Sequence, residues 1–321
     1  MLGFGLGLNK WRRVGGGYVG LLDLYPNAAA AYSLRLLRKD YSGGLVRARA
    51  WDGLANQGEA DIMPYRVSAN EYVLDLNSTL ENLDATAISR GLTTSDTLAD
   101  LVSTGVNDYD GLTSAWYDQS LSNNATQSTA ANQPKIVSGG SLVTENGKPA
   151  VDFDGANDYF TLGGTNDAGM VGNISVFSVN KNLGTSTSVV ISTGLTGSSS
   201  AFVMQWSLTG NTSNRYTGTT SDGTTRINED VTAANYGSQV LVSMINNESG
   251  NLQLFADGVA STGQTAVAPM NDANYPLQIG RDVFRSSYYF SGSMQELVMY
   301  SSLPNRTGIE TNINTFYSIY P

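Results

Sequence analysis

The chain has 321 residues, of which 40% are hydrophobic and only 14% are charged, and its formal net charge is −10. It contains neither cysteine nor histidine, which excludes disulfides, thiolate chemistry, the usual zinc ligands and histidine-based triads. A bound metal would be a hard cation held by oxygen atoms, with Ca²⁺ as the first expectation. The sequence has no block of basic residues, so nucleic acid is not an expected partner.

Residues 1–25 form a predicted N-terminal arm in which glycines interrupt a short apolar stretch. The basic residues of the arm follow this stretch instead of preceding it, so it does not read as a secretory signal. No run of the chain approaches the roughly 18 apolar residues that span a bilayer. We expect the arm to anchor the chain to neighbouring subunits, with a solvated tail as the alternative. The predicted anchoring residues are Leu2, Phe4, Leu6, Leu8 and Trp11.

Residues 26–145 read as a mixed α/β segment. A helix is predicted over 26–39, because a proline suits its first turn and the alanines that follow have high helix propensity. Alternating apolar and basic residues predict a strand at 45–50, and a second strand is expected near 71–76. Ser95 is expected to cap a short helix. The apolar face of that helix would be formed by Leu98, Leu101 and Val102.

Residues 146–321 follow a pattern of strands and turns that predicts a β-sandwich. Two of the runs are apolar on both faces, as expected for central strands. A closing helix is expected over 305–317, where apolar residues recur with the helical period. The expected fold class is therefore mainly β. The predicted strands are 174–179, 240–245, 252–256, 277–280 and 294–300.

The run over 116–160 is the most informative for function, since a polar, asparagine-rich loop leads into a strand there. The candidate glycan-binding residues are Trp116, Tyr117, Asp118 and Gln119. The aromatic rings could stack on a sugar, and the neighbouring side-chain oxygens could bind a sugar or calcium. In the alternative interpretation, Asp118 and Ser120 fix a turn through backbone amides and Trp116 belongs to the core.

A candidate calcium site follows at Asp154, Asn157 and Asp158, where Gly155 permits a sharp turn. The alternative is an ordinary hairpin turn. Glu296 alternates with apolar residues on a late strand, so a buried carboxylate that needs a partner is expected there. It could be a ligand, or it could pair with an arginine such as Arg281. Glycosidases need two carboxylates, and Asp118 with Glu296 is one imaginable pair whose separation the sequence does not give.

The second half resembles the laminin-G-like domains of the concanavalin-A type, over about 150–321. The matching pieces occur in the same order and spacing as in those domains. They are Phe153-Asp154-Gly155, Ile174 to Val179, Leu252 to Gly258, Leu277 to Asp282 and Phe290 to Leu297. The resemblance implies a jelly-roll β-sandwich, a fold that hosts lectins, enzymes and adhesion modules alike.

The first half resembles a segment of fungal arabinofuranosidase B at Tyr117-Asp118-Gln119-Ser120. In that family a Gly-Asn-Gly-Asn-His stretch follows, whereas this chain has Leu121 to Ala125, without the glycines and the histidine. No motif here matches the catalytic carboxylates of the family. Together with the run Ala31 to Arg38, the chain also resembles virion proteins of bacteriophages. Its glycine-rich start resembles the anchoring ends of tail or capsid appendage proteins.

These resemblances lead us to expect a non-enzymatic structural virion protein of a phage. It would be assembled in the host cytoplasm, anchored to other virion proteins by residues 1–25, and homo-oligomeric like most appendage proteins. The mixed segment 26–145 would carry the β-sandwich 146–321, which could contact host surface glycans. A calcium-dependent lectin or carbohydrate-binding module is the first alternative, and an arabinofuranosidase-like glycoside hydrolase is the second.

Overall fold

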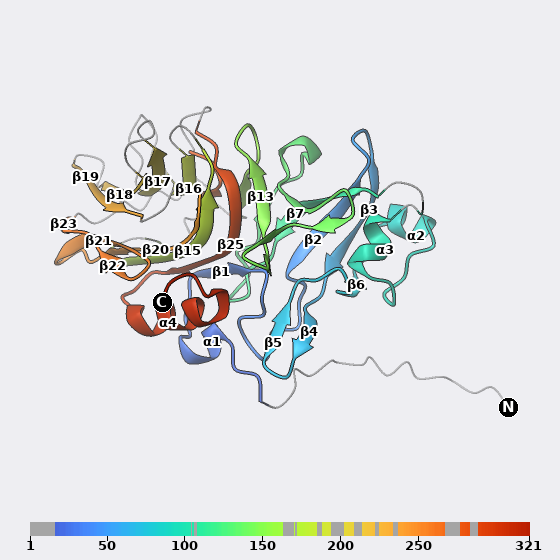
Figure 1. Cartoon of the computed structure of the whole chain (residues 1–321), viewed down its shortest axis with the longest axis horizontal. Helices are drawn as coiled ribbons and strands as arrows, with labels where there is room; N and C mark the ends of the chain where they lie inside the picture. Colours follow the sequence, from blue (N-terminus) through green and yellow to red (C-terminus); the bar gives the residue numbers. More distant parts are fainter. Residues whose placement is uncertain are drawn as a thin grey trace.

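The computed structural model describes residues 17–103, 105, 108–162, 170, 172–184, 188–193, 202–208, 214–221, 225–233, 237–266, 277–282 and 288–321. The predicted anchoring residues of the arm lie outside this part of the chain. The fold is mainly β, which confirms the predicted fold class (Figure 1). Among the described residues, no helix combines the length and hydropathy that crossing a membrane requires.

Among the described residues before position 146, the elements are short strands, three small helices and one 3₁₀ turn. The helical elements are α1 (Leu21–Leu24), α2 (Ala85–Ser89), α3 (Leu98–Val102) and η1 (Ala130–Asn132). The strands are β1 (Ala30–Ser33), β2 (Val46–Trp51), β3 (Asn56–Ile62), β4 (Tyr65–Ser68), β5 (Glu71–Val73), β6 (Leu80–Glu81), β7 (Asp110–Trp116), β8 (Ala125–Thr126), β9 (Lys135–Ser138), β10 (Ser141–Leu142) and β11 (Thr144–Glu145).

The described elements after residue 146 are strands of two to ten residues, followed by the helix α4 (Arg306–Tyr317). The first of these strands are β12 (Lys148–Pro149), β13 (Val151–Asp154), β14 (Phe160–Leu162), β15 (Ile174–Asn182), β16 (Ser188–Thr193), β17 (Phe202–Leu208) and β18 (Asn214–Ser221). The remaining strands are β19 (Arg226–Thr232), β20 (Gln239–Asn246), β21 (Asn251–Ala256), β22 (Val259–Ala260), β23 (Gln264–Thr265), β24 (Gln278–Ile279) and β25 (Ser291–Tyr300).

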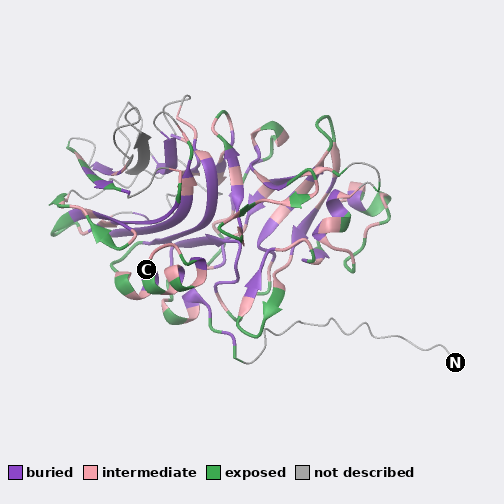
Figure 2. Cartoon of the chain, in the orientation of Figure 1, coloured by how far each residue is buried: buried purple, intermediate pink, exposed green. Residues whose placement is uncertain are grey.

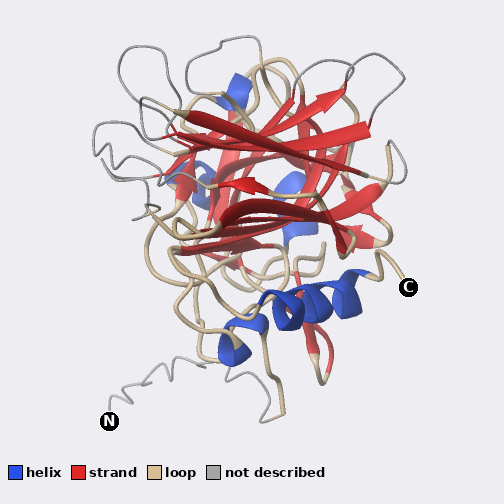
Figure 3. Ribbon diagram, turned by 90° about the vertical axis from the view of Figure 1, so that its left-hand side faces the viewer, coloured by secondary structure: helices blue, strands red, loops and turns tan. Residues whose placement is uncertain are grey.

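Strand β25 is the central element of the molecule. It pairs antiparallel with β1, β13 and β15, and β15 continues to β20. Its residues after the first are all buried, because one face packs in the main core and the other packs under α4 (Figure 2). Figure 3 shows the strands in stacked layers, with α1 and α4 outside them near the C-terminus.

Two sets of strands on either side of position 146 join the same sheet network. β1 pairs with β25, and β9 pairs with both β7 and β13. One hydrophobic core runs through both sets, from Val46 and Trp116 to Phe160 and Met299. The division of the chain into residues 1–25, 26–145 and 146–321 stays a prediction.

The predicted helix over 26–39 is wrong. The structure has the short α1 before it and the strand β1 within it. The alanines favour a helix locally, but Ala28 to Leu37 are buried on all sides. β1 forms ladder hydrogen bonds with β25, and tertiary packing therefore overrides helix propensity.

Most of the other predicted elements are confirmed, with shifted ends. Six of the seven predicted strands are present, as β2, β15, β20, β21, β24 and β25. The predicted closing helix is α4. The predicted strand 71–76 ends early, at Val73. Helix α3 is capped by Thr97 in a capping box with Asp100, and not by Ser95 as predicted.

Candidate functional site

Asp118 is buried and its carboxylate holds the loop that follows β7. Its Oδ1 atom accepts hydrogen bonds from the amides of Ala31 (2.8 Å) and Ser120 (2.8 Å) and from the Ser120 hydroxyl (2.6 Å). Its Oδ2 atom accepts from the amides of Leu121 (3.1 Å) and Asn123 (3.0 Å). Asp118 is only 2% exposed, so both carboxylate oxygens make their hydrogen bonds within the protein and not with solvent.

Gln119 is also buried, and its side chain makes hydrogen bonds with the backbone of residues 33–37. Its Oε1 atom accepts from the amide of Leu37 at 2.8 Å, and its Nε2 atom donates to the carbonyls of Ser33 and Arg35. Trp116 is fully buried in the main core. The polar atoms of Asp118 and Gln119 are thus bonded within the protein, and Trp116 packs in the core. Glycan binding by Trp116, Tyr117, Asp118 and Gln119 stays a prediction.

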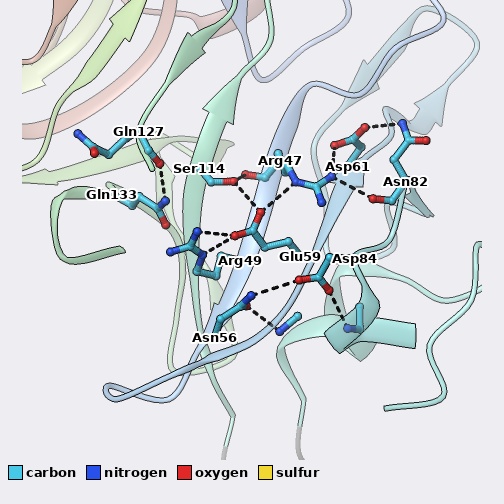
Figure 4. Close-up of polar contacts among 12 residues, drawn as sticks. Arg47, Arg49, Asn56, Glu59, Asp61, Asn82, Asp84, Ser114, Gln127 and Gln133 are labelled. Atoms are coloured by element: carbon cyan, nitrogen blue, oxygen red, sulfur yellow. Dashed lines mark hydrogen bonds and ion pairs between the residues drawn. The ribbon is translucent and has the colours of Figure 1, made fainter. Parts of the chain in front are cut away.

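Tyr117, the fourth of these residues, is half-buried and belongs to a polar surface on β2 and β3. This surface, the arginine–carboxylate face, includes Arg47, Arg49, Glu59 and Asp61 (Figure 4). Tyr117 joins it because its hydroxyl donates to the Oδ1 atom of Asp61 at 2.5 Å. Arg47 bridges Glu59 at 3.0 Å and Asp61 at 2.9 Å, while Arg49 contacts Glu59 at 2.5 Å. The alternation of β2 produces this face, because its apolar residues point into the core.

Every carboxylate oxygen of the arginine–carboxylate face has a protein partner. The Oδ2 atom of Asp61 accepts from Asn82 at 2.6 Å, and its Oδ1 atom accepts from Arg47 and the Tyr117 hydroxyl. Burial alone would lower the pKa of Arg47, but its hydrogen bonds to Asp61 and Glu59 more than offset this and the pKa is raised. Burial, and then the bond to Asp61, raises the pKa of Tyr117. The face is thus a closed ionic network that stabilises the sheet.

Replacing Glu59 by glutamine is expected to lower the free energy of unfolding by about 2 kcal/mol, because two half-buried arginines lose their shared charge partner. Urea denaturation would measure the loss. Glu71→Gln is the control, since the Glu71 side chain is more exposed (27% against 13% for Glu59) and pairs only with Lys148. Equal losses in the two variants would contradict a special role for the network.

Asp154 and Asp158 stabilise a tight turn, because each carboxylate accepts a hydrogen bond from the backbone amide of the other residue. The Oδ1 atom of Asp154 accepts from the amides of Ala156, Asn157 and Asp158 at 2.8, 3.1 and 3.3 Å. The Oδ2 atom of Asp158 accepts from the Asp154 amide at 2.9 Å, and Gly155 adopts a φ of 75° that suits the turn. Within the described ranges, no group of three or more acidic residues could hold a metal ion. The calcium site at 154–158 stays a prediction.

Asp158 is buried next to other acids. Burial raises its pKa to about 7; the hydrogen bond from the Asp154 amide lowers it, and the charges of Asp154 and Asp152 raise it. Burial also raises the pKa of Asp152. The carboxyl of Asp158 is thus largely protonated below pH 7 in the folded protein.

Stability is therefore expected to fall as pH rises from about 4 to 7, because the folded state holds a proton on Asp158 that the unfolded chain releases near 3.8. Asp158→Asn should remove about 4 kcal/mol of this fall, because a rise of the pKa from 3.8 to about 7 corresponds to about 1.4 kcal/mol for each pH unit between the two values. Urea denaturation at pH 4, 5.5 and 8 would show the difference. If the variant and the wild type had parallel pH profiles, Asp158 would not be the responsible group.

Two tyrosines and an arginine that are half-buried lie in contact next to this turn. This tyrosine–arginine stack consists of Tyr159, Arg281 and Tyr289, which are all half-buried. The Arg281 Cζ atom lies 4.8 Å from the Tyr159 ring centroid and 5.6 Å from that of Tyr289. The two rings are 6.4 Å apart and inclined by 50°.

Hydrogen bonds on both sides fix the backbone of the tyrosine–arginine stack. Gln127 donates to the Tyr159 carbonyl at 3.2 Å, and the Ser192 hydroxyl donates to the Arg281 carbonyl at 2.7 Å. Arg281 and Tyr289 face each other in an isolated antiparallel bridge. The stack is therefore presented on a rigid support.

Glu296 does not pair with Arg281, which was one of the two expectations for it. Its partner is Arg35, whose Nε and Nη2 atoms contact the two carboxylate oxygens at 2.7 and 2.9 Å. The hydroxyls of Ser33 and Tyr317 also donate to Glu296. This pair is almost fully buried, and Asn312 and Tyr317 of α4 make hydrogen bonds with it.

The sequence did not reveal the stack as a site. Tyr159 and the pair Arg281 and Tyr289 are far apart in the chain, and each alone resembles an ordinary strand-end residue. The β14–β24 pairing of Phe160 with Ile279 brings them together. An arginine followed by two adjacent tyrosines, Tyr288 and Tyr289, was the one local signal.

No protein-family model matches the chain, and no curated protein matches it. Among solved structures, a GH54 α-L-arabinofuranosidase mutant soaked with 4-nitrophenyl α-L-arabinofuranoside is similar, with a TM-score of 0.56 and 16% identity. A GH54 α-L-arabinofuranosidase soaked with a cyclic sulfate inhibitor gives 0.55 and 15%. Each match covers 89% of this chain and 62% of the other chain. A SAP-like pentraxin from Limulus polyphemus gives 0.37 and 12%, covering 44% of this chain and 69% of its own.

The two GH54 matches show the class of fold. The chain is a β-sandwich protein that shares most of its architecture with GH54 enzymes, and it spans about 62% of the length of those enzymes. At such low identity the likeness shows the fold alone.

Proposed function

We propose that the protein binds carbohydrate without cleaving it, and that the sugar lies against the tyrosine–arginine stack. The observation that carries this proposal is the pair of half-exposed tyrosine rings held 6.4 Å apart beside a guanidinium. Aromatic rings offer an apolar surface with a polar edge, and they dominate many binding sites for that reason. The GH54-like fold supports a carbohydrate ligand by analogy.

The fixed positions of the stack also support a binding role. Tyr159 is held at its amide by the Asn132 carbonyl and at its carbonyl by Gln127, and Arg281 is held by Ser192. Side chains that are already ordered lose little conformational entropy when a ligand binds. The stack therefore needs no rearrangement to receive a sugar ring.

The acid residues favour binding over hydrolysis. A glycosidase needs one acid and one free carboxylate on either side of the bond. The oxygens of Asp118, Glu296, Glu59 and Asp61 are occupied by amides, hydroxyls or arginines. None of these four carboxylates is available to attack a sugar or activate a water.

An arabinofuranosidase-like hydrolase is the second candidate. The GH54-like fold favours it, and Asp158, with its pKa of about 7, has the proton affinity of a general acid. Release of 4-nitrophenol from 4-nitrophenyl α-L-arabinofuranoside, lost in Asp158→Asn, would establish the hydrolase. Absence of release with intact sugar binding would favour the binding protein.

Affinity electrophoresis against neutral and acidic polysaccharides, including arabinan, tests the binding proposal. The wild type is expected to be retarded by at least one polymer, and Tyr159→Ala is expected to bind it about tenfold more weakly. Tyr109→Ala is the matched control, because Tyr109 also lies under an arginine, Arg90, at 5.2 Å. Retardation by no polymer, or equal losses in both variants, would contradict the proposal.

The placement of this protein in a phage virion, with an anchoring arm and several copies, stays a prediction from the sequence. Mass spectrometry of purified particles would test it by the presence and copy number of the chain. Loss of the chain from particles on deletion of residues 1–16 would support the anchor.

A further inference from the structure

We propose that the sugar held at the tyrosine–arginine stack carries a carboxylate, as a hexuronate or a sialic acid does, and that the guanidinium of Arg281 binds this carboxylate. The inference rests on the proposed function, because it names the class of sugar for the same site. It concerns charge recognition, which the two tyrosine rings alone would not provide.

The charge of Arg281 lacks a carboxylate partner within the part of the chain that the structure describes. Its Nε atom is buried and makes no hydrogen bond. Six other arginines of the described chain form ion pairs with acidic side chains, whereas the hydrogen bonds of Arg66 and Arg90 go to backbone carbonyls. These paired arginines are Arg35, Arg38, Arg47, Arg49, Arg215 and Arg306. A half-buried cation without an acceptor is the place where a ligand can supply one.

The two tyrosine rings hold the guanidinium in a defined position. Its Cζ atom lies over both rings, at 4.8 Å and 5.6 Å from their centroids. Such contacts restrict the rotamers of Arg281 and leave the fork of N–H groups as its recognition element. A planar carboxylate accepts two parallel N–H bonds from this fork, which a hydroxyl of a neutral sugar cannot do.

The negative net charge of the chain means that an anionic sugar is attracted only by groups close to the binding site. The chain carries a formal net charge of −10, so an anionic ligand is repelled at long range. Attraction then depends on Arg281 itself and on contacts of the sugar ring with Tyr159 and Tyr289. The rings favour a carboxylate borne by a sugar over one borne by an acidic peptide, because a glutamate side chain has no ring to cover them.

Isothermal titration calorimetry with matched probes tests the proposal. The probes are oligogalacturonate and its carboxyl-reduced form, and sialyllactose and lactose. The wild type is expected to bind an acidic probe at least about tenfold more tightly than its neutral partner. Arg281→Gln is expected to lose this preference, while Arg281→Lys should retain part of it. Arg66→Gln, a change at an exposed arginine beside Tyr72, should keep the preference.

The outcomes separate the inference from the proposed function. Equal binding of acidic and neutral probes would overturn the carboxylate and leave a carbohydrate-binding protein. An acidic preference that survives in Arg281→Gln would also overturn it. Tighter binding of hexaglutamate than of any sugar would overturn it in favour of a peptide ligand. Failure of every sugar and every polysaccharide to bind would overturn the proposed function as well.

Discussion

Replacing Glu296 by alanine is expected to lower the free energy of unfolding by about 4 kcal/mol. The side chain is fully buried, and its removal leaves the guanidinium of Arg35 buried without a charge partner. The hydroxyls of Ser33 and Tyr317 lose their acceptor at the same time. Breaking a buried pair from one side is costly because the remaining charge cannot return to water.

Urea denaturation followed by circular dichroism would measure this loss. Asp230→Ala is the control, since the Arg215–Asp230 pair has a similar distance of 2.8 Å but is about 40% exposed. Exposed pairs contribute about 0–1 kcal/mol, so the control should change little. If Glu296→Ala itself fails to fold, Glu296→Gln keeps the test, because it preserves the shape and one acceptor. A loss below 1 kcal/mol in both would show that the pair is not a structural centre.

Replacing Asp118 by alanine is expected to cost about 4 kcal/mol of stability. The change removes the acceptor of four backbone amides and one hydroxyl, which are held within a segment that also supports β1. Each buried donor left without a partner costs about 1 kcal/mol or more. Asp154→Ala is the control, because Asp154 accepts three amides in an exposed turn and should cost less.

The milder change Asp118→Asn separates structure from function. It should lower the free energy of unfolding but leave the dissociation constant for the bound glycan unchanged, because the Asp118 oxygens face the protein. Titration calorimetry at a temperature where the variant stays folded would give both answers. A large loss of affinity in a well-folded Asp118→Asn protein would place the glycan at 116–119 after all.

The sequence predicted the β-sandwich well, for a physical reason. The runs 174–179 and 240–245, which lie in β15 and β20, are apolar on both faces, and only a central position in a layered fold buries both faces at once. It failed at 26–39, where alanines were interpreted as a helix. The helix preference of Ala amounts to less than about 1 kcal/mol per residue, so the ladder with β25 outweighed it.

The candidate site was harder to predict because its chemistry depends on distant neighbours. Asp118 and Gln119 look like ligand residues in the sequence, but backbone groups of β1 and the chain that follows it use their polar atoms. Tyr159 and Arg281 come together only through β14 and β24. The residue types at 116–119 therefore indicated polar and aromatic chemistry, but they did not indicate that Trp116, Asp118 and Gln119 are buried.

The most direct test of the central claim is a crystal structure of the protein soaked with its best-binding glycan. We predict density for a sugar ring against Tyr159 and Tyr289, with its nearest ring atoms at about 4 Å from an aromatic face. A sugar bound instead at the arginine–carboxylate face or in the 116–120 segment, with the tyrosine–arginine stack left bare, would contradict the account.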